Sequence, residues 1–278
     1  MAALISINEN PGGELNRIVP ENPEVLALAA GRRPALSDAG LRPTGLVKII
    51  DQAGVQRSVP AAVEHALTIR VDGDELVTLM TIGSVPEHLV LGYLRNQGLI
   101  RNLSQVESVR VNWERELAEV ITVSGGGVSE PVDVDSPAPI HEPGLIRRSE
   151  IRRIVELVPR HNAVYRHAGS VHGCGLVRGG TMMRFVEDVG RHNATDAIAG
   201  WMWLEGQAGG DKVLYTTGRL TAEIAGKSAH MGIPAVISRN GVTRRAIELA
   251  EGAGVMLVAR ARRQGFQVFS CHDRLVLD

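Results

Sequence analysis

Residues 212–238 read Lys-Val-Leu-Tyr-Thr-Thr-Gly-Arg-Leu-Thr-Ala-Glu-Ile-Ala-Gly-Lys-Ser-Ala-His-Met-Gly-Ile-Pro-Ala-Val-Ile-Ser, and their pattern identifies the class of fold. The apolar run Lys212–Thr216 is typical of a strand, Ala222–Met231 of a helix, and Ala235–Ser238 of a second strand. Two strands joined by a crossover helix run parallel in one sheet, because the helix returns the chain to the edge where the first strand began. This stretch therefore predicts a parallel α/β unit.

The alternation of strands and helices continues on both sides of this unit. A helix is predicted from Arg191 to about Leu204 and another at Thr243–Glu251. The other elements predicted in this half of the chain are strands at Gly175–Val177, Met182–Val186, Val255–Ala259 and Phe266–Ser270, and a helix that starts at Ser149-Glu150. The fold class is therefore α/β, with a largely parallel sheet covered by helices on both faces; we place this αβα domain at residues 145–278.

A smaller α+β domain is predicted at residues 43–140. The turn Asp72-Gly73-Asp74 lies between two strand-like runs and indicates a hairpin, and Pro86-Glu87 opens a helix that Gly98 ends. The strands predicted here are Leu67–Val71, Leu76–Met80, Val106–Asn112 and Ala118–Val123. The glycine loop that follows the last of them occupies residues 124–131.

Two segments lack a clear period. Residues 1–42 are predicted to be a flexible leader with a short helix at Pro23–Ala30. Asp133–Pro143, with three prolines and few hydrophobic residues, is the best candidate for a linker between the domains.

Composition excludes several classes of protein. The 278 residues carry 30 basic and 31 acidic side chains, a balance that argues against a nucleic-acid-binding surface. Two cysteines form no disulfide framework and fit a reducing compartment. The N-terminus has no signal-peptide pattern, and no apolar stretch reaches the ~18 residues that span a bilayer. We expect a cytoplasmic protein with no nucleic-acid or membrane partner.

Arginine recurs where the predicted strands end. Ile146–His192 holds nine arginines against four acidic residues. Beyond the strand ends lie Thr217-Gly218-Arg219, Arg239-Asn240-Gly241 and Arg260–Gly265, and Gly190 precedes the helix that begins Arg191-His192-Asn193. Parallel sheets bind ligands at this edge. Arginines and unpaired helix N–H groups placed there together favour binding of a phosphate group. The alternative interpretation is that these segments are glycine turns with solvent-exposed arginines and bind no ligand.

Other motifs support no established chemistry by themselves. The loop Ser124–Pro131 lacks the Gly-Lys-Ser/Thr end of a Walker loop and the third glycine of a dinucleotide fingerprint. His172-Gly173-Cys174 lacks the glutamate and the Cys-x-x-Cys pair of a zinc deaminase, so no metal site is predicted. Cys174 is either a buried structural residue or a nucleophile. Glu187-Asp188 are either an acid/base pair or capping carboxylates at the N-terminus of the helix that follows them.

Glu187-Asp-Val-Gly-Arg-His-Asn-Ala-Thr-Asp196 resembles the signature of the FdhD family, sulfurtransferases accessory to formate dehydrogenase. The resemblance extends from about residue 47 to about residue 275 and includes Leu67–Gly73, Ser170–His172, Thr216–Arg219 and Val236–Arg239. It implies a cytidine-deaminase-like αβα domain, a homodimer, and binding of the bis-guanine-dinucleotide form of the molybdenum cofactor, which GDP would mimic. This ligand has phosphates of the kind that the strand-end arginines suit.

The family's sulfur-carrier cysteines are missing from this chain. Aligned with the family's Gly-Cys-Gly-x-Cys-Gly loop, the cysteine positions hold Gly126 and Ser129. A serine hydroxyl cannot carry sulfur as a persulfide does. No catalytic residue is therefore assigned in this loop. The sulfur that the family's loop receives comes from a cysteine desulfurase, which becomes only a possible partner.

The strand-end pattern and the resemblance together predict the cofactor-binding residues: His172, Asp188, Arg191, His192, Asn193, Thr217, Gly218, Arg219, Ser238, Arg239, Arg260, Ala261, Arg262, Arg263, Gln264 and Gly265. The main hypothesis is an accessory protein that binds the molybdenum cofactor and delivers it to the catalytic subunit of a formate dehydrogenase. One alternative keeps sulfur transfer, through Cys174 or a thiol of a partner. Another is a non-catalytic scaffold of the dehydrogenase.

Overall fold

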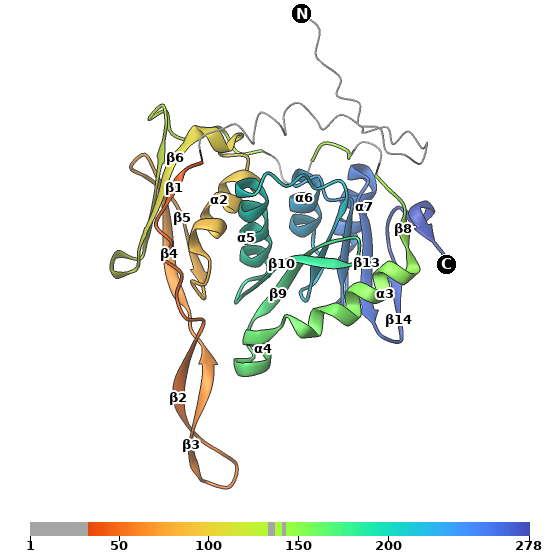
Figure 1. Ribbon diagram of the computed structural model, residues 1–278, viewed down its shortest axis with the longest axis horizontal. Coiled ribbons are helices and arrows are strands. Elements are labelled where there is room, and N and C mark those ends of the chain that lie inside the picture. The colour runs from red at the N-terminus through yellow and green to blue at the C-terminus, as the bar shows by residue number, and fades with distance from the viewer. Residues whose placement is uncertain (1–32, 133–136, 141–142) are drawn as a thin grey trace, which may run out of the picture.

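The computed structural model describes residues 33–132, 137–140 and 143–278, and it confirms a mixed α/β fold. Two sheets stand at opposite sides of the molecule with helices packed between them (Figure 1). The predicted helix at Pro23–Ala30 and parts of the predicted linker lie outside the described residues.

The larger sheet belongs to the C-terminal half and has the strand order β10-β9-β11-β12-β13-β14. Its strands are β9 (His172–Arg178), β10 (Thr181–Asp188), β11 (Lys212–Thr216), β12 (Ala235–Ser238), β13 (Met256–Arg262) and β14 (Gly265–Val268). Only β11, β12 and β13 run parallel, whereas β9, β10 and β14 join through antiparallel pairings. The prediction of a largely parallel sheet was therefore wrong at both edges, because tight turns rather than crossover helices connect β9 to β10 and β13 to β14.

Helices cover both faces of this sheet, as predicted. They are α5 (Arg191–Leu204), α6 (Ala222–His230) and α7 (Arg244–Ala253) on one face and α3 (Arg148–Leu157) on the other. Ile198 of α5 and Leu249 of α7 share one apolar core, and Ile151 and Ile154 of α3 lie in another beneath the opposite face. A short helix α4 (Ala163–Ala168), which was not predicted, precedes β9.

The smaller sheet has the order β1-β6-β7-β4-β5. Its strands are β1 (Ala35–Leu36), β4 (His65–Val71), β5 (Asp74–Thr81), β6 (Val106–Asn112) and β7 (Leu117–Thr122). The β4–β5 hairpin is as predicted. Residues 33–42 differ from the predicted flexible leader, because β1 pairs with β6 and the Leu41 N–H donates to the Gly83 carbonyl.

Helix α2 (Pro86–Asn96) packs directly against α5, and two glycines allow this close approach. A Cβ on Gly92 would lie 1.6 Å from the Asp196 carbonyl oxygen, and one on Gly200 would lie 2.0 Å from that of His88. No side chain fits at either position without moving the helices apart. The two halves of the chain are thus joined by a helix–helix contact with backbone against backbone.

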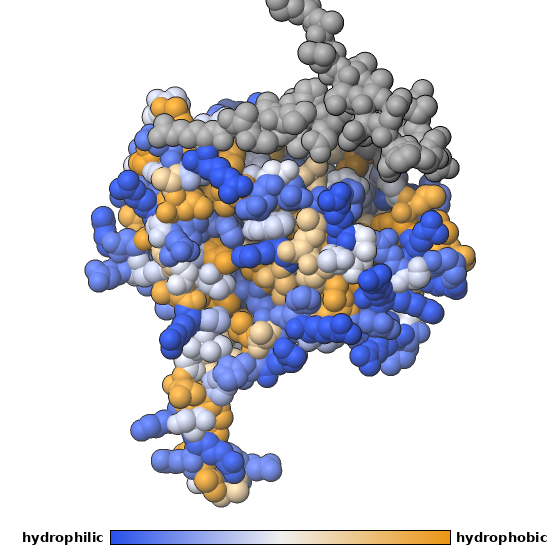
Figure 2. Space-filling view, viewed as in Figure 1, coloured by the Kyte–Doolittle hydropathy of each residue, from blue (hydrophilic) through white to orange (hydrophobic). Residues whose placement is uncertain are grey.

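A two-stranded hairpin, β2 (Thr44–Ile50) and β3 (Gln56–Ala62), extends away from the body (Figures 1 and 2). Leu46 and Ile50 on it are 76% and 69% exposed. The two remaining strands, β8 (Ile146–Arg147) and β15 (Leu275–Val276), pair with each other near the C-terminus. None of the helices in the described part of the chain is long and apolar enough to span a membrane.

Candidate anion-binding cleft

Exposed arginines gather at the edge where β11, β12 and β13 end. They are Arg219, Arg239, Arg260, Arg262 and Arg263. None of them takes part in a salt bridge with any residue that the structure describes. Guanidinium groups gathered without carboxylates make a surface that attracts multiply charged anions.

Two adjoining cavities open at this edge, and Arg239, Asn240 and Arg262 line both. The larger has a volume of about 800 Å³, and its wall also includes Arg260, Gln264, Gly265 and Phe266. The smaller, of about 450 Å³, is bounded by Val155, Val158, Pro159, Asn162, Tyr215, Ala261 and Arg263. No acidic residue lines either one. Together they form a cationic cleft with an apolar wall.

Asn162 in the smaller cavity was missed from the sequence. Its side-chain oxygen Oδ1 is buried and has no hydrogen-bond partner within the described residues. Tyr215 lies on the same wall, where burial raises the pKa of its hydroxyl to about 12, so the hydroxyl remains a donor at neutral pH. An unpaired acceptor beside a donor and an apolar wall suits the polar edge of a nucleobase. A loop asparagine carries no sequence signal that would have revealed this position.

Arg191 lies beside Arg219 at the N-terminus of α5. A Cβ on Gly218 would lie 2.4 Å from Cδ of Arg191, so the glycine makes room for the arginine side chain. Burial lowers the pKa of Arg191, and the neighbouring charge of Arg219 lowers it further. The Nε of Arg191 is buried without a partner in the described structure. An anion at this point would relieve the repulsion between the two guanidinium groups.

His172 connects this pair to the cavities. Burial lowers the pKa of His172, and the positive charges of Arg191, Arg239 and Arg219 lower it further, so all three arginines act on this imidazole. Thr217 Oγ1 lies 3.3 Å from His172 Nδ1 and accepts a hydrogen bond from the Gly173 N–H at 3.0 Å. The cationic cleft thus continues from the cavities to the start of α5.

Ser238 and Ala261 shape the cleft rather than supply charge to it. Ser238 Oγ donates to the Gly218 carbonyl at 2.6 Å and accepts from the Asn240 N–H at 2.9 Å, so it holds two of the loops together. The Ala261 side chain is buried in the apolar core under the sheet. Cofactor contact at these two positions remains a prediction.

Three of the predicted cofactor residues form hydrogen bonds or ion pairs with other protein groups. Asp188 is buried and accepts hydrogen bonds from Thr81 Oγ1, the Gly190 N–H and Asn193 Nδ2. Asn193 also donates to the Met80 carbonyl at 2.7 Å. Both residues therefore attach the start of α5 to the end of β5. Their cofactor roles stay predictions without support from these contacts.

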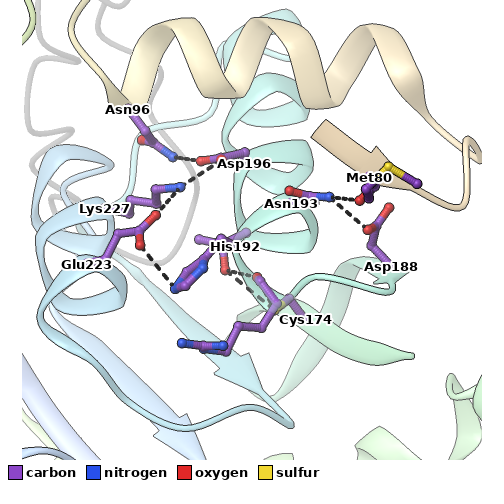
Figure 3. A network of polar contacts seen from close by, with 11 residues as sticks. Met80, Asn96, Cys174, Asp188, His192, Asn193, Asp196, Glu223 and Lys227 are labelled. Carbon is purple, nitrogen blue, oxygen red and sulfur yellow. Dashed lines mark hydrogen bonds and ion pairs between the residues drawn. The ribbon is translucent and has the colours of Figure 1, made fainter. Parts of the chain in front are cut away.

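The third such residue, His192, ends a chain of polar contacts that runs along α5. In Figure 3 the linked side chains are Asn96, Asp196, Lys227, Glu223 and His192. Burial lowers the pKa of His192 to about 4 despite the Glu223 carboxylate 3.4 Å away, so its ring is neutral at pH 7. It adds a polar but uncharged group to the cationic end of α5.

The Glu187 carboxylate forms a helix cap, but not at the helix that follows it, where the second of its two interpretations placed the cap. It accepts the N–H groups of Val164 and Tyr165 at 2.8 and 2.9 Å, in the first turn of α4. The helix concerned is α4 rather than the one that follows Glu187. Tyr165 in turn lies under the Arg239 guanidinium, 5.4 Å from ring centroid to Cζ. The cap therefore helps to fix α4 beside the cleft.

The glycine loop 124–131 lies at the far end of the smaller sheet. Asp72 accepts the Gly127 N–H at 3.0 Å, and the Ser129 N–H donates to the Leu99 carbonyl at 2.8 Å. Asp72 precedes β5, whereas Thr81 ends β5 and contacts Asp188 beside the cleft. The length of β5, at about 3.3 Å per residue, puts roughly 25 Å between the loop's anchor and that end. Within one chain the loop does not reach the arginines.

Cys174 is an inaccessible thiol. It is fully buried, and burial raises its pKa although hydrogen bonds with the hydroxyls of Thr216 and Thr195 oppose the effect. Its sulfur lies 3.3 Å from Thr216 Oγ1 and 3.5 Å from Thr195 Oγ1. A sulfur carrier needs an accessible thiolate. These observations weigh against the alternative in which Cys174 transfers sulfur.

We expect iodoacetamide to alkylate Cys174 at least about 100-fold more slowly in native protein at pH 8 than in urea-unfolded protein. Burial blocks access to the sulfur, and the raised pKa lowers the fraction of thiolate. Peptide mass spectrometry distinguishes it from Cys271, which serves as the internal comparison. Rapid alkylation of Cys174 in folded protein would restore the sulfur-transfer alternative.

An acid-free, arginine-lined cleft beyond parallel strands has the charge and position of a candidate anion-binding site. A family model described as the FdhD/NarQ family matches residues 62–276, and the chain belongs to this family. It is 27% identical over 241 residues to the sulfur carrier protein FdhD of Bacillus licheniformis, covering 80% of this chain and 92% of that one. The corresponding protein of Geobacillus kaustophilus is 26% identical over 243 residues, with the same shares covered.

A solved structure is also similar. The crystal structure of a protein assigned as a formate dehydrogenase accessory protein from Desulfotalea psychrophila superposes with a TM-score of 0.74 at 26% identity. The match covers 84% of this chain and all of that one. The resemblance noted in the sequence is thereby confirmed at the level of the family. The predicted homodimer and desulfurase partner stay predictions.

Proposed function

We propose that this chain binds the bis-guanine-dinucleotide molybdenum cofactor as cargo and assists its delivery to a formate dehydrogenase during maturation of that enzyme. The observation that carries the proposal is the acid-free cleft, in which two adjoining cavities share Arg239 and Arg262. Similar proteins named as sulfur carriers or as a formate dehydrogenase accessory protein support the same assignment.

The residues present fit such a ligand. Arginines flank both cavities, so phosphate groups can pair with forked guanidinium donors on either side of Arg239. The unpaired Asn162 oxygen can accept N–H groups of a guanine, and Val155 and Val158 offer an apolar wall for its ring. This chain's contribution is to bind and orient the cargo, while the molybdenum chemistry belongs to the ligand.

Sulfur transfer by this chain is not part of the proposal. Residues 124–131 contain no cysteine, and the structure holds that loop away from the arginines. Cys174 is buried. Delivery without a sulfur relay through this loop is therefore the function that the geometry supports best.

Calorimetry with GDP tests the binding step. We expect a dissociation constant in the range of about 1 to 100 µM, and at least about 30-fold weaker binding of guanosine, which lacks the phosphates that the arginines recognise. Equal binding of the two compounds, or none of either, would remove the polyphosphate site from the proposal.

Delivery needs a separate measurement. Protein purified gently from a molybdenum-replete host should release guanine nucleotide and a pterin, detectable by mass spectrometry. Adding this cargo-loaded protein to cofactor-free formate dehydrogenase should increase its activity above that obtained with protein stripped of cargo. If GDP binds but neither pterin release nor activation is observed, the cleft serves another nucleotide.

A further inference from the structure

A third cavity, of about 400 Å³, lies along the free edge of β10 and shares no lining residue with the arginine cleft. Six successive residues of the strand, 182–187, line it. Its opposite walls come from Ile82, Ser84 and Val85 before α2, and from His161 and Val164 at α4. The cavity is thus a groove between an edge strand and two other segments.

The lining shows that the groove faces the strand's backbone. Phe185 packs over Gly173 on the α4 side of the sheet, whereas Val186 lies in the core on the α5 side. Neighbouring side chains of a strand point to opposite faces, so a cavity bounded by both sets must lie at the edge itself. The groups at that edge are the N–H and C=O groups of β10 that point away from β9.

These backbone groups are available for pairing. Among the described residues β10 pairs with β9 alone, and no backbone hydrogen bond joins residues 181–187 to any other segment. The bulge between Met182 and Arg184 disturbs only the start of the strand, and Arg184–Asp188 pair regularly with β9. An edge of this kind accepts a further strand from an extended peptide.

Arg184 supplies the charge of the groove. Its Nε is buried without a hydrogen-bond partner, and it forms no salt bridge within the described chain. Glu187, the one carboxylate in the lining, is occupied by the N–H groups of α4. Glu205, whose charge acts on Arg184, is paired with Arg33 at 3.8 Å. A carboxylate entering the groove would therefore find an unoccupied guanidinium.

We propose that the β10 groove binds an extended peptide of a partner protein, which adds a strand to β10 and places an acidic side chain against Arg184. Met182, Met183 and Phe185 give the neighbouring peptide side chains an adaptable apolar surface. The backbone pairing supplies affinity for any extended segment, and Arg184 selects those that carry a carboxylate. This inference does not depend on the nucleotide cleft.

Fluorescence anisotropy with two labelled peptides tests the proposal on the full chain. The probes are N-acetylated and C-amidated Val-Thr-Val-Asp-Val and Val-Thr-Val-Lys-Val. We expect the acidic peptide to bind at least about 10-fold more tightly, because it alone makes a charge-assisted hydrogen bond with Arg184. Arg184→Gln should abolish this difference, whereas Arg178→Gln, an exposed arginine on β9 paired with Asp211, should preserve it.

Two measurements test the strand pairing without altering the protein. A version of the acidic peptide with N-methylated backbone nitrogens should bind at least about 10-fold more weakly, because it cannot donate to the edge. Hydrogen exchange should slow at residues 184–187 when the unmethylated peptide binds. Equal binding of the acidic and basic peptides, full binding of the methylated one, protection confined to other strands, or no binding at millimolar concentration would each overturn the proposal. Protection of β10 by self-association alone would assign the groove to a second copy instead.

Discussion

Replacing Lys227 by methionine is expected to lower the free energy of unfolding by about 3–5 kcal/mol. Lys227 is 1% exposed, and its Nζ lies 2.7 Å from Asp196 Oδ2 and 3.0 Å from Glu223 Oε1. Burial alone would lower the pKa of Lys227, but the two carboxylates outweigh it and leave the pKa raised, so the ammonium stays charged. Without it, the buried Asp196 carboxylate keeps only the Asn96 amide as a side-chain donor.

A second buried lysine provides the control. Lys212 is 3% exposed and pairs with Asp211 at 2.6 Å, but Asp211 is itself 49% exposed and can be hydrated when the lysine is removed. Lys212→Met should therefore cost at most about 1 kcal/mol. Urea denaturation of both variants makes the comparison, and a loss below about 1 kcal/mol in Lys227→Met would contradict the assigned role.

A double variant separates the charge from the packing. Asp196→Leu combined with Lys227→Met removes both buried charges, and we expect it to recover part of the loss of Lys227→Met, because the remaining carboxylate, Glu223, is 42% exposed and can be hydrated. Recovery would locate the cost in the uncompensated carboxylate. No recovery would locate it in the shape of the site between α2, α5 and α6.

The sequence predicted the elements of the fold better than their connections. Apolar periodicity and terminal signals placed α5 at its observed bounds and α7 within two residues, where Thr243 Oγ1 accepts the Ala246 N–H and Gly254 ends the helix at φ 71°. The antiparallel direction of the strands at the sheet edges was missed, because periodicity shows which face of a strand is buried and not how its neighbours run. The α2–α5 contact at Gly92 and Gly200 was missed because a helical glycine signals no particular partner.

The candidate site shows the same division. Arginines beyond strand ends were predictable, because strand order brings those ends to one edge. Asp188 and Asn193 belong to the same motif but point to β5, and the motif does not encode that direction. Asn162 and Tyr215 enter the cleft from a loop and a strand interior that had no distinguishing pattern. The groove of β10 could not be found at all without the tertiary structure, because its walls come from three separate segments.

Removing two guanidinium groups from the cleft should abolish nucleotide binding without unfolding the protein. Arg219 and Arg239 are both exposed at the edge where β11 and β12 end, and the charges of both lower the pKa of His172, so we expect them to contact the same anion. A charge-assisted hydrogen bond contributes about 1.5–3 kcal/mol, so Arg219→Ala with Arg239→Ala should weaken GDP binding by more than about 100-fold. The thermal midpoint should change little, because neither side chain is part of a core.

The controls for this double variant distinguish specific arginine contacts with GDP from a general effect of the protein's positive charge. Arg178→Ala removes an exposed arginine that lies beside Lys212, at the opposite end of β11, and should leave GDP affinity within about threefold. Arg239→Lys keeps the charge but loses the fork and its stacking on Tyr165, so its affinity should fall between those of wild type and Arg239→Ala. If Arg178→Ala weakened binding as much as the double variant, net charge alone would explain the affinity. If the double variant bound GDP within about threefold of wild type, the anion would lie elsewhere, because two desolvated guanidinium contacts cannot be lost at so small a cost.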